Sequence, residues 1–285
     1  MSSLLSYLSP WEFSPLVLLS CVSAGVLFWL GMQRRRRDGL RTGVWRTLSF
    51  YLGLVLTYVV MQTYVDYLSQ HMFWVHRLQH LVLHHLAPLL IALAYPHEII
   101  GCAIPRQWQS QILLPIWNNV LVRSVYQFLQ NPIVAPVLFV GLIYFWLIPS
   151  LHFDAMLSYS RYEIMNWSML VDGLLFWWLM VDNRMPHEHR TLRYPIRIVI
   201  LFLAMIGQIL IGAHIALTDS DLYDVYSVCG RAWPISPHTD QVIGGLITWI
   251  PAAMMSVVGI LLVIRLWMRQ STAQAEMANV LVVEK

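Results

Sequence analysis

Residues 14–37 read SPLVLLSCVSAGVLFWLGMQRRRR, an apolar run that stops at four consecutive arginines. A helix needs about 20 apolar residues to cross about 30 Å of hydrocarbon, and the apolar part of this run has that length. Loops rich in arginine stay on the cytoplasmic side of a membrane. The run therefore predicts a first membrane span at residues 14–32, with the N-terminus outside and the arginines in the cytoplasm.

The composition extends this interpretation to the whole chain. Hydrophobic residues make up 58% of the 285 positions and charged residues only 12%, which is too apolar for a soluble domain of this length. The formal net charge is only +3 and the arginines lie in a few clusters, which indicates membrane topology rather than nucleic-acid binding. The three cysteines show no CxxC spacing, so the sequence predicts neither a disulfide framework nor a thiolate metal site.

Further apolar stretches predict an all-α, polytopic membrane helix bundle of about seven transmembrane helices in a single domain, 1–285. The remaining spans are predicted at 47–68, 73–95, 132–149, 162–181, 198–217 and 242–267. Residues 96–131 are predicted to form an amphipathic cytoplasmic connection, with an extra span as the alternative, and 270–285 a tail. Because most arginines then fall on one side, the C-terminus is also predicted to be cytoplasmic.

Histidines concentrate at the start of the third span, where five occur between His71 and His85. Ionisable side chains inside lipid are costly and usually functional. His76, His80 and His84 follow one another four residues apart, which places neighbouring Cβ atoms about 5–6 Å from each other, close enough for two imidazoles to bind one ion. His76 and His84 are roughly 12 Å apart along the helix axis, so the row predicts two sites or a relay of ions.

Other donors are predicted on the same side of the membrane. The candidate metal ligands are His76, His80, His84, His85, His152, His214, Met72 and Met156. Imidazole together with thioether suits copper, as Cu(I) or Cu(II), and iron is the alternative metal. Asp154 and Glu163 are expected to orient the rings by accepting hydrogen bonds. For any single histidine, a hydrogen bond between helices is the competing interpretation.

Several pieces of the chain resemble one known family. The run from His76 to Pro88 resembles the HxxxHxxLxxxAPxLL stretch of the CtaG-type assembly factors of caa3 cytochrome c oxidase. Residues 149–154 resemble that family's HxPxLYDxAL region, residues 173–178 read GLLFWW as in its helix, and residues 240–249 follow its DQxxGGLxxW pattern. The resemblance covers nearly the whole chain.

This resemblance implies a protein of the bacterial inner membrane, not an enzyme, that helps deliver copper to a haem-copper oxidase. The ligands it implies are His76, His80 and His152, on the periplasmic side. The implied partners are an oxidase subunit or a periplasmic copper carrier, and the lipid bilayer; no nucleic acid is expected, and a homodimer is compatible with the pattern. Where the family carries a further LHxxxH pair, this chain has Tyr162 and Asn166, which predicts an altered site.

Two other functions fit parts of the pattern. A di-iron or haem membrane oxidoreductase would use the HxxxH spacing, but a di-iron site needs roughly eight converging ligands. The second histidine cluster, His187 to His189, is predicted on the opposite side of the membrane. A copper transporter would need polar groups that continue toward the inner face, whereas the third span reads LLIALA after Pro88.

Overall fold

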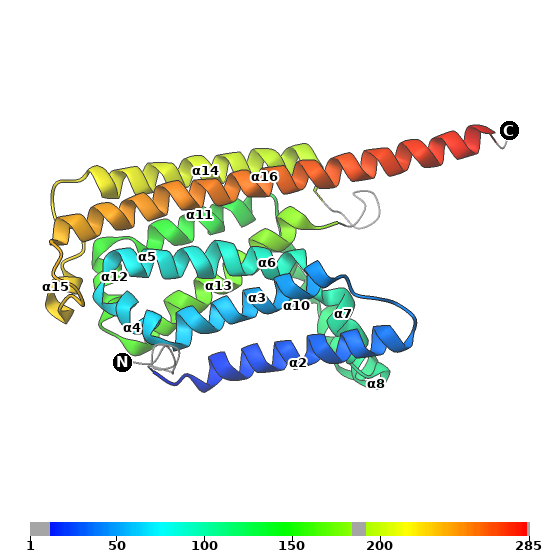
Figure 1. The fold of residues 1–285 in the computed structure, drawn as a ribbon, viewed down its shortest axis with the longest axis horizontal. Coiled ribbons are helices and arrows are strands. Elements are labelled where there is room, and N and C mark those ends of the chain that lie inside the picture. Colours follow the sequence, from blue (N-terminus) through cyan, green and yellow to red (C-terminus); the bar gives the residue numbers. More distant parts are fainter. Residues whose placement is uncertain (1–11, 184–191, 284–285) are drawn as a thin grey trace.

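The chain is a bundle of helices whose long axes run in roughly the same direction (Figure 1). A computed structural model describes residues 12–183 and 192–283, with side chains described as far as residue 274. Every regular element in these ranges is a helix. α14 and α16 lie along one side of the bundle and α2 along the opposite side, with the other long helices between them (Figure 1).

Among the described residues, five helices are long and apolar enough to cross a membrane. They are α2 (Pro15–Arg37), α3 (Val44–Gln62), α13 (Tyr159–Val181), α14 (Tyr194–Leu217) and α16 (Pro237–Val283). Two bent pairs also pass the same test, Phe73–Leu93 with Pro96–Ala103 at 65° and Val120–Leu129 with Val134–Trp146 at 71°, which raises the number to seven. The predicted all-α, multi-pass architecture of about seven spans is therefore confirmed.

The second span is shorter than predicted. α3 ends at Gln62, and a separate helix, α4 (Tyr64–His71), begins immediately after it. Thr63 has extended backbone and its hydroxyl accepts a hydrogen bond from the Val65 amide, which makes it the N-cap of α4. The chain therefore turns at Thr63 instead of continuing to residue 68, and residues 64–71 lie outside the candidate spans.

The third span contains a π-helical turn. It consists of α5 (Phe73–Leu81), the π-helix η1 (Val82–Leu86) and α6 (Ala87–Leu93). Pro88 has no amide hydrogen, so it cannot bond to the carbonyl four residues earlier. The Trp177 indole donates to that carbonyl, on His84, at 3.2 Å. A Cβ on Gly173 would lie 2.5 Å from the same oxygen, so glycine allows α13 to approach the π-turn.

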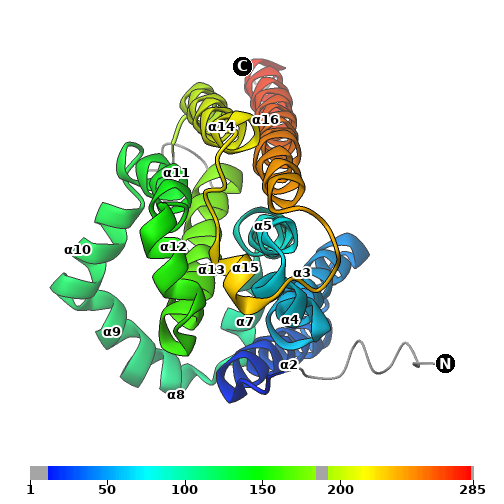
Figure 2. The ribbon, with the colours of Figure 1, turned by 90° about the vertical axis from the view of Figure 1, so that its left-hand side faces the viewer.

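The segment between the third and fourth spans is helical and lies at the side of the bundle. It contains α7 (Pro96–Ala103), α8 (Arg106–Trp108), η2 (Gln109–Leu113), α9 (Leu114–Asn118) and α10 (Val120–Leu129). α8, α9 and α10 form an arc that leaves the bundle on one side (Figure 2). α10 joins α11 (Val134–Trp146) as one of the two bent pairs and counts with the fourth span, and α7 counts with the third. The described helices of this segment therefore make no candidate span of their own, and the alternative of an extra span is not supported.

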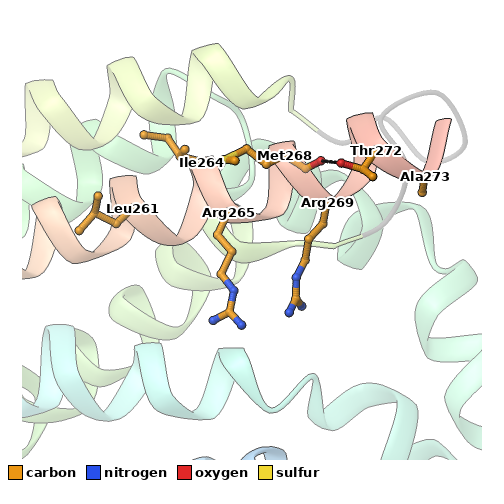
Figure 3. Close-up of a pocket in the computed structure, with 7 residues that line it drawn as sticks. All are labelled: Leu261, Ile264, Arg265, Met268, Arg269, Thr272 and Ala273. Atoms are coloured by element: carbon orange, nitrogen blue, oxygen red, sulfur yellow. Dashed lines mark hydrogen bonds between the residues drawn. The ribbon is translucent and has the colours of Figure 1, made fainter. Parts of the chain in front are cut away.

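The two ends of the bundle differ in character. Short helices gather at one end, where α4, α12 (Pro149–Met156) and α15 (Val225–Cys229) lie near the start of α5 (Figure 1). We call the other end the arginine-rich end, because it carries Arg34 to Arg37 at the end of α2 and two arginines of α16. Figure 3 shows Arg265 and Arg269 extending from the same side of α16, beside a surface hollow of about 580 Å³ that contains no histidine.

Candidate functional site

Three histidine rings meet at the end of the bundle that carries the short helices. The His76 ring centroid lies 4.2 Å from that of His80, one turn later on α5, and 5.1 Å from that of His152 on α12. All three side chains are buried, with at most 1% of each residue exposed. We call His76, His80 and His152 the three-histidine group. The prediction that His76 and His80 lie side by side is confirmed, and α12 brings His152 to them.

Hydrogen bonds fix the protons on two of these rings. The Nδ1 of His152 must donate to the Trp146 carbonyl at 3.0 Å, because a carbonyl only accepts, so its Nε2 lone pair accepts from the Tyr226 hydroxyl at 2.9 Å. An arginine only donates, so Nδ1 of His80 accepts from Arg77 at 3.4 Å, and Nε2 of His80 donates to the Asn166 amide oxygen at 3.1 Å. Both rings therefore already use their lone pairs.

His76 is different from its two neighbours. Both of its ring nitrogens are buried without a hydrogen-bond partner in the described part of the chain, an arrangement that costs free energy. His152 lies on α12, outside the candidate spans, and burial lowers the pKa of its ring to about 3. The ring therefore stays in the neutral form that binds metals. Within residues 12–183 and 192–283, no three His, Cys, Asp or Glu side chains are arranged to hold a metal ion as they stand.

The two positions that depart from the family pattern both face the three-histidine group. Asn166 bonds to His80, and the Tyr162 ring centroid lies 6.2 Å from that of His76. The Tyr162 hydroxyl donates to the Asp66 carboxylate at 2.7 Å and also contacts Ser69. These substitutions therefore place an amide and a phenol, instead of further imidazoles, beside the buried rings.

Asp66 gives the protein a pH dependence whose sign follows from its burial on α4. Burial raises the pKa of its carboxyl from 3.8 to about 6, against the opposing effect of hydrogen bonds from Tyr162, Gln79 and Gln70. Because the folded state binds this proton more tightly than the unfolded chain, the free energy of unfolding falls by about 3 kcal/mol as pH rises from about 3 to about 7. In Asp66→Asn, the thermal midpoint should change less with pH across this range than in the parent protein. An unchanged pH dependence would mean that other groups cause it.

The π-turn buries two further histidines deeper in the bundle. The Nε2 of His84 bonds to the Asp172 carboxylate at 3.0 Å, and the Nε2 of His85 contacts the Gln208 amide nitrogen at 3.0 Å. The Nδ1 atoms of both rings are buried without a partner among the described residues. The two histidines, together with Arg77 and His80, line a cavity of about 10 Å³, the volume that one water molecule needs. This histidine pair contacts α13 and α14, not His152.

The remaining predicted donors lie in different surroundings. Met72 is fully buried one turn before His76, and Met156 packs against an apolar cluster with Ala155 and Met165. His214 is exposed on α14, so the structure does not bring it to the buried rings. Asp154 pairs with Arg161 at 3.2 Å on the surface, and Glu163 accepts from the Trp167 indole, so neither orients a ring as expected. His187 and His189 lie outside the described residues.

Three contacts of the site were missed by the sequence interpretation. Tyr226 reaches His152 from a loop 74 positions away in the chain, and no local pattern marks it. Asn166 was noted only as a departure from the family. Arg77 carried a usable signal, since it is an arginine between two histidines in an apolar segment; its guanidinium is buried and donates to Thr248 at 2.9 Å.

These features define a class of protein: an all-helical, multi-pass membrane protein with buried histidines at one end of its bundle. Residues 26–270 match the cytochrome c oxidase caa3 assembly factor family, and the chain belongs to that family. No curated protein and no solved structure matches the chain. Membership supports a role in oxidase assembly and favours a non-catalytic one, and it associates the protein with a haem-copper oxidase and the lipid bilayer.

Proposed function

We propose that the protein binds copper at the three-histidine group and assists its delivery to the haem-copper oxidase during assembly. One observation carries this proposal: the two ring nitrogens of His76 are buried, have no partner among the described residues, and lie next to two other imidazoles. A buried imidazole without a partner is costly, and a metal ion would satisfy it. Neutral imidazoles suit copper, and Met72, buried one turn away, offers a thioether to Cu(I).

We also propose an orientation for the bundle in a bacterial inner membrane. The arginine-rich end would lie in the cytoplasm, because clustered arginines resist translocation. The three-histidine group would then lie toward the periplasmic side, where an oxidase subunit or a periplasmic copper carrier can exchange the ion. A reporter fused after Arg37 should behave as cytoplasmic, and an external signal there would invert this orientation.

The metal content of the purified full-length protein tests the copper proposal. We expect elemental analysis to find copper in the parent protein, and at least about tenfold less in the double variant His76→Ala/His80→Ala, because lost ligands weaken metal binding by orders of magnitude. The matched control is His238→Ala, which removes an exposed histidine outside the group and should keep the parental copper. Equal copper in all three proteins would refute the proposal, and iron in place of copper would favour an oxidoreductase.

A further inference from the structure

The loop that joins α14 to α16 covers the three-histidine group. It spans residues 218–236 and contains α15, which lies in front of the bundle in the view down this end, between α13 and α4 (Figure 2). Two tyrosines of the loop are buried, Tyr223 at 5% and Tyr226 at 0% exposure. Tyr223 stacks on Phe73, with ring centroids 4.1 Å apart, and its hydroxyl donates to the Leu147 carbonyl. The loop is therefore packed against the start of α5, close to His76.

Side chains of α16 fasten this loop at both ends. The Gln241 amide donates to three carbonyls near the end of α14, and its oxygen accepts from the Leu222 amide at 2.7 Å. At the other end, Arg231 contacts the Asp240 carboxylate at 3.4 Å, and Trp233 stacks on Trp74 with ring centroids 5.8 Å apart. The section with Tyr226 lies between these two anchors.

Tyr226 occupies the one nitrogen of His152 through which this ring could bind a metal. The Nδ1 of His152 carries its proton toward the Trp146 carbonyl, so only the Nε2 lone pair remains, and the Tyr226 hydroxyl donates to it at 2.9 Å. A metal ion bound to His152 would need that same lone pair. The hydrogen bond and a metal–His152 bond therefore exclude each other.

We propose that Tyr226 is a gating residue, which blocks His152 while the site is empty and must leave it, with α15, for metal to bind. This inference rests on the proposed copper-binding function. Tyr226 is not expected to become a ligand itself. A phenol ligates best as a phenolate, so its proton needs an acceptor. In the described part of the chain, the only acceptor in hydrogen-bond contact with the Tyr226 hydroxyl is His152, and the metal would take that lone pair. Metal would enter past the α14–α16 loop.

Replacing Tyr226 by phenylalanine tests the gate, because it removes the competing hydroxyl and keeps the packed ring. We expect purified, full-length Tyr226→Phe to bind Cu(I) about fivefold more tightly than the parent, the size expected for one neutral hydrogen bond that no longer competes. The measurement is a titration against a chromophoric Cu(I) chelator. The matched control is Tyr223→Phe, which removes a hydroxyl of the same loop that bonds to a backbone carbonyl instead of a histidine. Its affinity should remain within about twofold of the parent.

Two outcomes of the titration would overturn the gate. An unchanged affinity in Tyr226→Phe would show that the hydroxyl does not compete with the metal, and a weaker affinity would make Tyr226 a ligand. If neither the parent nor the variants bind Cu(I), the proposed function fails, but the gate can still be measured. Acylation of His152 by diethyl pyrocarbonate, followed by mass spectrometry, should then be several times faster in Tyr226→Phe than in Tyr223→Phe, and equal rates would reject the gate.

Discussion

Replacing Gly245 by leucine should leave almost no folded protein, because α14 and α16 approach each other there at backbone distance. A Cβ on Gly245 would lie 2.6 Å from the Ala216 amide nitrogen, and one on Gly212 would lie 2.7 Å from the Trp249 nitrogen. Neither neighbour is a flexible side chain that could move aside. Small residues at such contacts supply much of the packing that holds helices together in lipid. We expect even Gly245→Ala to cost about 3 kcal/mol, at the upper end of the usual cost of overpacking.

The control for this prediction is Gly141 on α11, where a Cβ would meet nothing within 4 Å. Gly141→Ala should be neutral or stabilising by about 0.5–1 kcal/mol, because alanine is the better helix former. Gly141→Leu should fold normally. The measurements are the yield of monodisperse protein after size exclusion and the thermal midpoint in detergent. If both leucine variants gave the same yield, close backbone packing at Gly245 would not be what holds α14 to α16.

The spans were predictable because a helix that crosses hydrocarbon needs a long apolar segment, and one or two polar residues do not change that overall composition. The breaks within them depend on local chemistry and were harder to find. Pro88 is visible in the sequence, but the structure is needed to show what it does: the chain forms a π-turn before it, and the Trp177 indole donates to the freed His84 carbonyl. The break at Thr63 was missed because the apolar pattern continues past it, while the only local signal is a single residue, Thr63, whose hydroxyl caps the start of α4.

The faces of the helices were much harder to predict than the helices themselves. In a soluble protein, polar residues mark the side of a helix that faces solvent, but in lipid both sides are apolar. The spacing of His76 and His80 predicts that they share a face without saying what that face meets. His214 shows the difficulty, since it sits in a helix with a mean hydropathy of 2.4 and turned out to be exposed. The contacts of Tyr226 and Arg77 depend on packing between distant segments, which no local pattern encodes.

The DQxxGGLxxW stretch shows how a recognised motif acquires a physical meaning. Asp240 is fully buried and accepts hydrogen bonds from the amides of Phe73 and Trp74, at 3.1 and 2.9 Å. These amides begin α5 and have no partner within their own helix, so a carboxylate from α16 acts as the cap that α5 lacks. Arg231 contacts the same carboxylate and helps to balance its charge. Asp240 thereby fixes the start of the helix that carries His76 and His80.

Removing the Asp240 carboxylate should consequently be among the most damaging single changes in the protein. Asp240→Ala leaves the amides of Phe73 and Trp74 without their acceptor and Arg231 with only the Ser227 hydroxyl, so we expect a loss of about 3–5 kcal/mol, as for breaking a buried ion pair. Asp240→Asn keeps one acceptor oxygen and should lose about half as much. The control is Asp221→Ala, which removes an exposed aspartate of the neighbouring α14–α16 loop and should change stability by less than about 0.5 kcal/mol.

Thermal unfolding of the three variants in detergent measures these differences, and copper content in the same samples adds a second readout. Because Asp240 holds α5 in place, partial unfolding at its first turn should also separate His76 from His152. Asp240→Asn should therefore lose the copper that we propose this group binds, even at temperatures where the variant remains folded. A variant with lowered stability and parental copper would show that the cap supports the fold without positioning the rings. Parental stability in Asp240→Ala would instead mean that the α5 amides find another acceptor once the carboxylate is gone.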